Sequence, residues 1–436
     1  MSSGFQNIGR VPELQRRILF TFGMLAVYRL GAHIVTPGIA PEVIKHFFEQ
    51  MGGTVFGLFN LFSGGALEQL SIFALGIMPY ISASIIFQLL TIVVPALEQL
   101  QKEGESGRRK ITQWTRYATV VIALFQSTLL AIALENGHFG EGAVLIPGWG
   151  FRIMMAVTLT TGTAFIMWLG EQITERGIGN GISLIIFAGI VVRIPQALYA
   201  LGEQIRTDQF TLLGAILLLA FIAFFVGLVV LCERAQRRIP IQHARRVVGR
   251  KVMQGGMSYF PLRLNTAGVI PPIFASSILM FPLTITQFVN SPTIANFFSD
   301  HLGFGSPLYN VLYVSLIIFF AFFYTAIVIN PDDVADNIKR SGAYIPGIRP
   351  GKRTAEYIDR ILGRLTLIGA IYVAAVCVVP VMLSNQWGVP FFFGGTALLI
   401  VVGVALDTIG QIEAHLVSRQ YEGFVKGTRI RGRLGR

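Results

Sequence analysis

Long apolar runs recur along the whole chain, and they constrain its fold more than any other feature. A helix needs about 20 mainly apolar residues to cross roughly 30 Å of hydrocarbon. Ten runs of this kind can be read from the sequence: 18–35, 71–94, 117–134, 152–170, 181–200, 210–232, 266–289, 308–330, 362–384 and 389–410. Of the 436 residues only 13% are charged, about half of the roughly 25% typical of soluble domains. The chain is therefore predicted to be an all-α polytopic membrane protein with ten transmembrane helices.

Three of the ten runs carry a charge near one end. Arg29, Arg193 and Asp407 intrude on the first, fifth and tenth runs. A charged side chain at a helix centre costs about 2.5–3.5 kcal/mol on insertion scales. Near a helix end a long side chain can instead reach the membrane surface. The three runs are therefore kept as membrane spans.

Lysine and arginine predict the orientation of the chain. With ten spans both termini lie on one side, and that side receives 30 of the 35 basic residues. The opposite side receives four, and Arg29 lies inside a span. Basic residues are enriched in cytoplasmic loops, so both termini are predicted to be cytoplasmic. Eight of the basic residues lie in the single loop 233–265, which we interpret as a docking surface for an acidic partner, a nucleic-acid-containing partner or anionic lipid.

The sequence offers little catalytic chemistry. It contains no HExxH metal motif, no GxSxG nucleophile elbow and no GxxxxGK[ST] phosphate loop. The glycine-rich stretch 177–181 joins two spans, so we interpret it as a flexible turn between helices. The middles of the spans also lack the ionisable groups that ion-coupled transporters use. We therefore expect no enzyme activity, no cofactor and no metal site.

Four local patterns remain to be explained. The apolar segment 52–68 is too short to cross the membrane. It is either a movable plug or re-entrant element, or a static external helix. Isoleucines pair at i, i+4 spacing in spans two and five, where ordinary membrane packing is an alternative explanation. Polar side chains inside spans two, three and seven indicate either simple interhelical bonds or a seam that can part. The turn 346–351 places an arginine at its tip, suited to a partner's carboxylate or phosphate.

Several long motifs resemble those of the SecY family, the channel subunits of bacterial preprotein translocases. They are FSGGAL at 62–67, SIFALGIMPYISASII at 71–86, EGESGRRK at 103–110, WLGEQITERGIGNGIS at 168–183, NTAGVIP at 265–271 and PGIRPG at 346–351. The resemblance extends from about residue 10 to residue 425 and includes all ten spans. It is weakest in the loops 135–150 and 290–307 and at the C-terminal end.

The resemblance implies two pseudosymmetric five-helix halves and a short plug helix. The halves would be residues 18–200, with a plug at about 54–68, and residues 210–410, with docking loops at 233–265 and 331–361. Residues 1–17 and 411–436 would be cytoplasmic ends.

The resemblance also implies four sets of site residues. The pore ring would be Ile77, Ile81, Ile182, Ile186, Ile273 and Ile400. The plug would include Phe56, Leu58, Phe59, Asn60, Phe62, Ser63 and Gly64. The lateral gate would carry Gln88, Gln126 and Asn265. Partner docking would use Arg349, Arg245, Arg246, Arg250, Lys251, Arg108 and Arg109.

The function implied is a protein-conducting channel of the bacterial cytoplasmic membrane. It would pass unfolded preproteins across the membrane and release membrane spans sideways. The implied partners are small membrane subunits resembling SecE and SecG, the motor ATPase SecA, the ribosome, preprotein signal sequences and the lipid bilayer. Two alternatives are a carrier for an uncharged solute and an insertase without a pore. The first would need a polar midplane pocket, and the second would need neither a plug nor an apolar ring.

Overall fold

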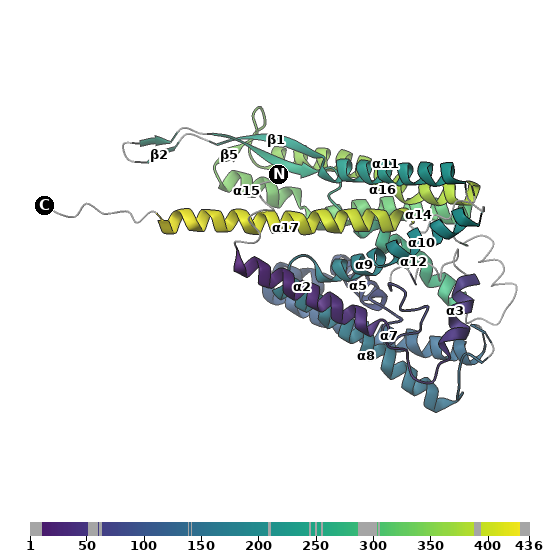
Figure 1. Cartoon of the computed structure of the whole chain (residues 1–436). Helices are drawn as coiled ribbons and strands as arrows, with labels where there is room; N and C mark the ends of the chain where they lie inside the picture. Colours follow the sequence, from purple (N-terminus) through teal and green to yellow (C-terminus); the bar gives the residue numbers. More distant parts are fainter. Residues whose placement is uncertain are drawn as a thin grey trace. The chain divides into compact units, whose positions relative to one another are not determined.

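The computed structural model describes residues 11–50, 60, 63–137, 139–140, 142–207, 211–243, 246–248, 251–253, 256–286, 303, 306–387 and 394–427. The chain divides into two compact units (Figure 1). The first contains Met1–Gln196 and Val404–Arg436, and the second contains Ala197–Gly403. Each unit is described by itself.

The first unit is helical. Its helices are α2 (Pro12–Gly31), α3 (Pro41–Gln50), α5 (Met78–Val93), α6 (Pro95–Lys102), α7 (Glu105–Glu135), α8 (Trp149–Arg176), α9 (Gly181–Val191), the start of α10 (Arg193–Arg206) and the end of α17 (Gly395–Gly427). Helices α7 and α8 pack against each other along a hairpin, and α2 packs against α8 (Figure 1). Helices α2, α7 and α8 are longer than the apolar runs predicted for them, because polar residues extend each helix beyond its hydrophobic part.

The second span of the first unit differs from the prediction, whereas the fifth lies within one candidate span, Gly181–Arg206, that contains a turn. The second run is helical only from Met78, because residues 71–77 form turns in which Gly76 has a φ of +56°. The helix then bends by 99° between α5 and α6, where Val94 is extended before Pro95, as expected for a residue preceding proline. The fifth run is divided at Val192 into α9 and α10. The amide nitrogens of Ile182 and Ser183 donate to the Asn180 side chain, which caps the start of α9.

The second unit combines helices with a small sheet. Its elements are the rest of α10, then α11 (Leu212–Arg234), β1 (Gln236–His243), β2 (Arg246–Val248), β3 (Lys251–Met253), β4 (Met257–Arg263), α12 (Ile270–Thr286), α14 (Pro307–Val328), α15 (Pro331–Arg340), β5 (Ala343–Tyr344), α16 (Lys352–Trp387) and the start of α17. Seven described helical segments across the two units are long and apolar enough to cross a membrane, and the bent pair α5–α6 gives an eighth. Helices α2 and α12 overlap the first and seventh apolar runs.

The basic loop 233–265 folds as a β-hairpin. Strands β4, β1 and β5 form an antiparallel sheet in that order, with Ile239 opposite Phe260. Ile239 and Ile241 point inward and alternate with exposed neighbours, the period of two expected of a half-buried strand. They share one apolar core with Leu262 of β4, with four residues of the second predicted docking loop and with the adjacent Leu362; the four are Ile338, Ala343, Ile345 and Ile358. We call β1, β4, β5, α15 and the start of α16 the sheet module.

Candidate functional site

The end of the predicted plug and the residues that follow it form a buried stretch that we call the stem, described at residues 60 and 63–77. Asn60 is helical, and residues 63–70 and 72–77 form turns on either side of Ser71, which makes a β-bridge to Val35. Ala66, Leu70 and Phe73 of the stem are buried. Four predicted plug residues, Phe56, Leu58, Phe59 and Phe62, lie outside the described residues.

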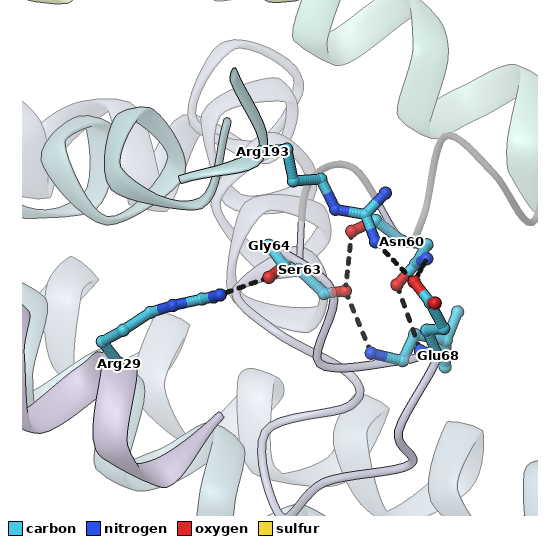
Figure 2. Close-up of polar contacts among 7 residues, drawn as sticks. Arg29, Asn60, Ser63, Gly64, Glu68 and Arg193 are labelled. Carbon is cyan, nitrogen blue, oxygen red and sulfur yellow. Dashed lines mark hydrogen bonds and ion pairs between the residues drawn. The ribbon is translucent and has the colours of Figure 1, made fainter. Parts of the chain in front are cut away.

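Hydrogen bonds inside the stem close it into a compact loop around Asn60 and Ser63 (Figure 2). The Asn60 carbonyl accepts from Gly65 N at 2.9 Å and from Ser63 Oγ at 3.2 Å. The Asn60 side chain accepts from Glu68 N at 3.1 Å, and Ser63 Oγ accepts from Leu67 N at 3.2 Å. Two predicted plug residues therefore provide the polar groups that shape this loop.

The glycine pair of the stem is required by geometry. Gly64 and Gly65 have φ values of +66° and +88°, in the left-handed region that favours glycine. A Cβ at Gly64 would lie 2.7 Å from the Cα of Gly189 in α9. The stem therefore lies directly against the backbone of α9, and no side chain fits at Gly64 without displacing one of them.

The last turn of α2 holds the stem by its main chain. Arg29 Nη1 donates to the Gly64 carbonyl at 2.7 Å (Figure 2), and the Tyr28 hydroxyl donates to the Ser63 carbonyl at 3.0 Å. The Tyr28 ring also stacks on Phe73, with centroids 6.0 Å apart. Beyond α2, Thr36 N donates to Leu70 O and Ile72 N donates to Ile34 O. The chain around the end of α2 thus contacts the stem at residues 63–64 and again at 70–73.

A carboxylate joins the stem to the start of α10. Glu68 Oε2 accepts from Asn60 Nδ2 at 2.9 Å and from Arg193 Nη2 at 2.7 Å (Figure 2). The Glu68 and Arg193 side chains are 22% and 24% exposed. Tyr28, Arg29, Glu68 and Arg193 were not among the predicted site residues. The sequence signal that could have found them is the charge of Arg29 and Arg193 near the ends of otherwise apolar runs.

The predicted ring isoleucines are found in both units. In the first unit, Ile77 caps the start of α5 and Ile81 follows one turn later, where both are buried. Ile186 of α9 is buried and Ile182 is half-buried. In the second unit, Ile273 of α12 and Ile400 of α17 are buried. Each set is placed within its own unit, so a single ring stays a prediction.

The predicted gate residues carry different hydrogen bonds. Gln88 Nε2 donates to Ser84 Oγ at 3.3 Å within α5, and Gln88 Oε1 is buried with no partner among the described residues. Gln126 is half-buried on α7. In the second unit, Asn265 Nδ2 donates to Glu233 Oε1 at 2.7 Å and to Gly268 O at 3.0 Å. A buried amide oxygen without a partner is costly in an apolar environment.

Arg349, a predicted docking residue, is exposed in the turn after β5. Gly347 and Gly351 on either side have φ values of +83° and +104°. Ile348 packs against the core of the sheet module. Thr354 Oγ1 donates to the Arg349 carbonyl at 3.0 Å. The turn therefore presents Arg349 to solvent from a fixed backbone.

The other predicted docking residues lie on two elements. Arg108 and Arg109 are exposed at the start of α7. Arg246 and Lys251 lie in the β2–β3 hairpin, and Arg245 and Arg250 lie outside the described residues. Within the described ranges no group of three His, Cys, Asp or Glu side chains could hold a metal ion.

Comparisons with known proteins place the chain in context. The family model of SecY matches residues 71–409. "Protein translocase subunit SecY" of Escherichia coli (strain K12) is 52% identical over 428 residues, which are 97% of this chain and 96% of that protein.

Two solved structures resemble the fold. One is described as showing that the plug domain of the SecY protein stabilises the closed state of the translocation channel. It has a TM-score of 0.69, 19% identity and 93% coverage of both chains. The other is Sec61 in the canine ribosome-channel complex from the endoplasmic reticulum, with a TM-score of 0.64, 16% identity and 93% coverage of both chains. The predicted fold class is confirmed.

Proposed function

The chain belongs to the SecY family and is a multi-pass membrane protein that forms a protein-conducting channel, and from this premise we propose how its residues work. We propose that unfolded preproteins pass through an apolar isoleucine ring, that the plug and stem close this ring at rest, and that hydrophobic segments leave sideways through a lateral gate.

The contacts of the stem carry this proposal. Tyr28, Arg29 and Arg193 hold the stem at carbonyl and carboxylate oxygens, and these bonds can be exchanged for bonds to water at modest net cost. Ile77, at the end of the stem, and Ile81, one turn into α5, are buried. Displacing the stem would break these bonds, take Leu70 and Phe73 out of their buried positions and expose Ile81.

Isoleucine suits a pore for chains of any sequence. A channel must bind its cargo weakly enough to let it leave, and an isoleucine ring offers a passing chain no hydrogen bond. Its β-branched side chains are stiff at χ1, so a ring of them can close around a polypeptide and leave little room for ions.

The lateral gate would open between spans two and three on one side and spans seven and eight on the other. The buried Gln88 Oε1, which has no partner among the described residues, supports a polar seam that is completed from another helix. A signal sequence carries about 7–15 apolar residues. Each buried methylene contributes about 0.8 kcal/mol, enough to outweigh several seam hydrogen bonds at about 1 kcal/mol each.

Energy and direction would come from partners. The exposed Arg349, Arg108 and Arg109 would dock a motor ATPase or the ribosome through carboxylates or phosphates. Small membrane subunits resembling SecE and SecG would complete the complex in a bacterial cytoplasmic membrane. The 30-to-4 distribution of basic residues supports cytoplasmic termini.

Ring substitutions test this function. Ile81→Ser combined with Ile182→Ser should raise the resting ion conductance of the reconstituted protein in planar bilayers, because small polar side chains leave room for hydrated ions. Ile86→Ser is the matched control, since Ile86 lies on the same helix α5 and is 46% exposed. Conductance equal to that of the unmodified protein in the ring variant would contradict the proposal.

A further inference from the structure

Glu68 and Arg193 form an ion pair that an apolar pore does not require. Their side chains meet at 2.7 Å and are mostly shielded from solvent. Removing charges from water is costly unless they are paired and hydrogen-bonded. Here the pairing is specific, because Glu68 Oε2 accepts from both Arg193 and Asn60 (Figure 2).

We propose that Glu68 and Arg193 form a latch that sets the free energy needed to release the plug. This inference rests on the proposed function. One carboxylate oxygen joins Asn60, at the plug end of the stem, to Arg193, at the start of α10. Moving Asn60 away while Arg193 stays in place must therefore break at least one of the two bonds.

The latch differs chemically from the two contacts that α2 makes with the stem through Tyr28 and Arg29, which we call the anchors. Tyr28 and Arg29 bind main-chain carbonyls of Ser63 and Gly64, which a residue of any type would offer. The Glu68–Arg193 pair depends on two side chains. Substitutions at these two positions can therefore change the threshold for opening without altering the path of the backbone.

Because of the surrounding charges, substitutions of Glu68 and of Arg193 should have unequal effects. Arg29 and Arg193 carry the same charge, and both donate to the stem, at the Gly64 carbonyl and the Glu68 carboxylate. Figure 2 shows Arg29 and Arg193 reaching the stem from two different helices. Loss of the Glu68 charge leaves these two guanidinium groups facing the stem without that carboxylate. Loss of the Arg193 charge leaves Glu68 with its bond from Asn60. The Glu68 substitution should therefore have the larger effect.

Weakening the latch should shift the channel toward its open state. A ten-fold change in the closed-to-open equilibrium corresponds to about 1.4 kcal/mol. A less stable closed state also needs less free energy from the incoming signal sequence. Resting leak and the hydrophobicity required of a signal sequence should therefore change together.

The test measures resting ion conductance of the complete channel complex in planar bilayers. Glu68→Gln should raise the leak about ten-fold, the change expected for ~1.4 kcal/mol, and Arg193→Gln should raise it less. The double variant should leak less than Glu68→Gln alone, because it also removes the unbalanced cation. Glu68→Asp keeps the charge at shorter reach and should lie between wild type and Glu68→Gln, which covers the case that Glu68→Gln fails to fold.

A control ion pair and a deletion of the plug distinguish failure of the latch from failure of the proposed function. Glu135→Gln with Arg152→Gln removes an ion pair of the same kind, in which Glu135 also accepts from Gly148 N, and should leave the leak unchanged. A channel that lacks residues 54–62 should leak strongly if the plug seals it.

The outcomes have separate meanings. If the deletion raises the leak while the Glu68 and Arg193 variants leave it unchanged, the latch alone is overturned. A deletion that does not leak would overturn the proposed function. A double variant whose leak is the product of the two single effects would show independent action and also overturn the latch.

Discussion

The stem and the sheet module both bury apolar side chains, but different contacts fix them in place. The sheet module is built on eight buried apolar residues and a three-stranded ladder. The stem also buries Leu70 and Phe73. Its links to α2 and α10, however, are hydrogen bonds that side chains of these helices donate to oxygen atoms of the stem.

This difference suits the sheet module to present a fixed surface and the stem to move. A buried core is lost only when the region unfolds, because every side chain supports its neighbours. A few directional bonds between elements can break together and be replaced by bonds to water, at about 0.5–1.5 kcal/mol for a neutral bond and about 1.5–3 kcal/mol where a partner is charged. The comparison predicts that core substitutions affect the module strongly, and that single polar contacts control the stem.

The largest effect is expected from Ile358→Ala in the sheet module. Ile358 is fully buried in its core, and removing such a side chain costs about 2–5 kcal/mol. Hydrogen exchange at the amides of β1 and β4 should become faster, while resting ion leak stays unchanged. Ile368→Ala is the control, because Ile368 is exposed on the same helix α16. Unchanged exchange in the sheet would show that the core does not hold the module.

Arg29→Gln should have the next largest effect, and it should be confined to the stem. The substitution removes a charged hydrogen bond to the Gly64 carbonyl, worth about 1.5–3 kcal/mol. Resting leak should rise and the Gly65 and Leu67 amides should exchange faster, with no change in the sheet. Arg29→Lys keeps the charge and should be milder. Equal exchange of the stem amides in Arg29→Gln and in the unmodified protein would contradict this interpretation.

Tyr28→Phe should weaken the stem less than Arg29→Gln. It keeps the ring that stacks on Phe73 and removes only the neutral hydrogen bond to the Ser63 carbonyl, worth about 0.5–1.5 kcal/mol. The measurement is again stem amide exchange and resting leak. Tyr199→Phe, at an exposed tyrosine, should be silent. An effect of Tyr28→Phe larger than that of Arg29→Gln would reverse the proposed order of the anchors.

Arg349→Glu should change the stability of the sheet module least, by less than about 0.5 kcal/mol as for surface positions. Arg349 is exposed, so reversing its charge should act on a docked partner only. We expect loss of motor-driven export from a protein that still inserts and keeps its β1–β4 exchange protection. Normal stimulation of the motor ATPase by this variant would exclude Arg349 as a docking residue.

The spans could be predicted because hydropathy is a local property of the sequence. The helix start was misplaced by seven residues in the second run, Ser71 against Met78, since backbone turns at 71–77 are bonded inside protein instead of facing lipid. The hairpin in the basic loop escaped the prediction, although the alternation of Ile239 and Ile241 with exposed residues is a strand pattern.

Part of the site could also be predicted. Asn60, Ser63 and Gly64 were predicted as plug residues from the resemblance to a family, and the structure places them in the stem. Arg29 and Arg193 were noticed only as charges that weaken two spans. Their partners lie 35 and 125 residues away along the chain, and no local pattern records a contact at such separations. Glu68 was included only in the plug range, because a single acidic residue in a loop carries no signal of its own.

Photo-crosslinking to a translocating chain tests the central claim most directly. A secretory precursor would be stalled midway through the reconstituted channel, with a photo-crosslinking side chain placed in turn at Ile81, Ile182 and Ile400. The account predicts crosslinks from all three positions to the same precursor, because the three isoleucines would line one pore. Crosslinks confined to residues 233–265 and 331–361 would contradict it, and would mean that the protein docks a partner while the precursor passes elsewhere.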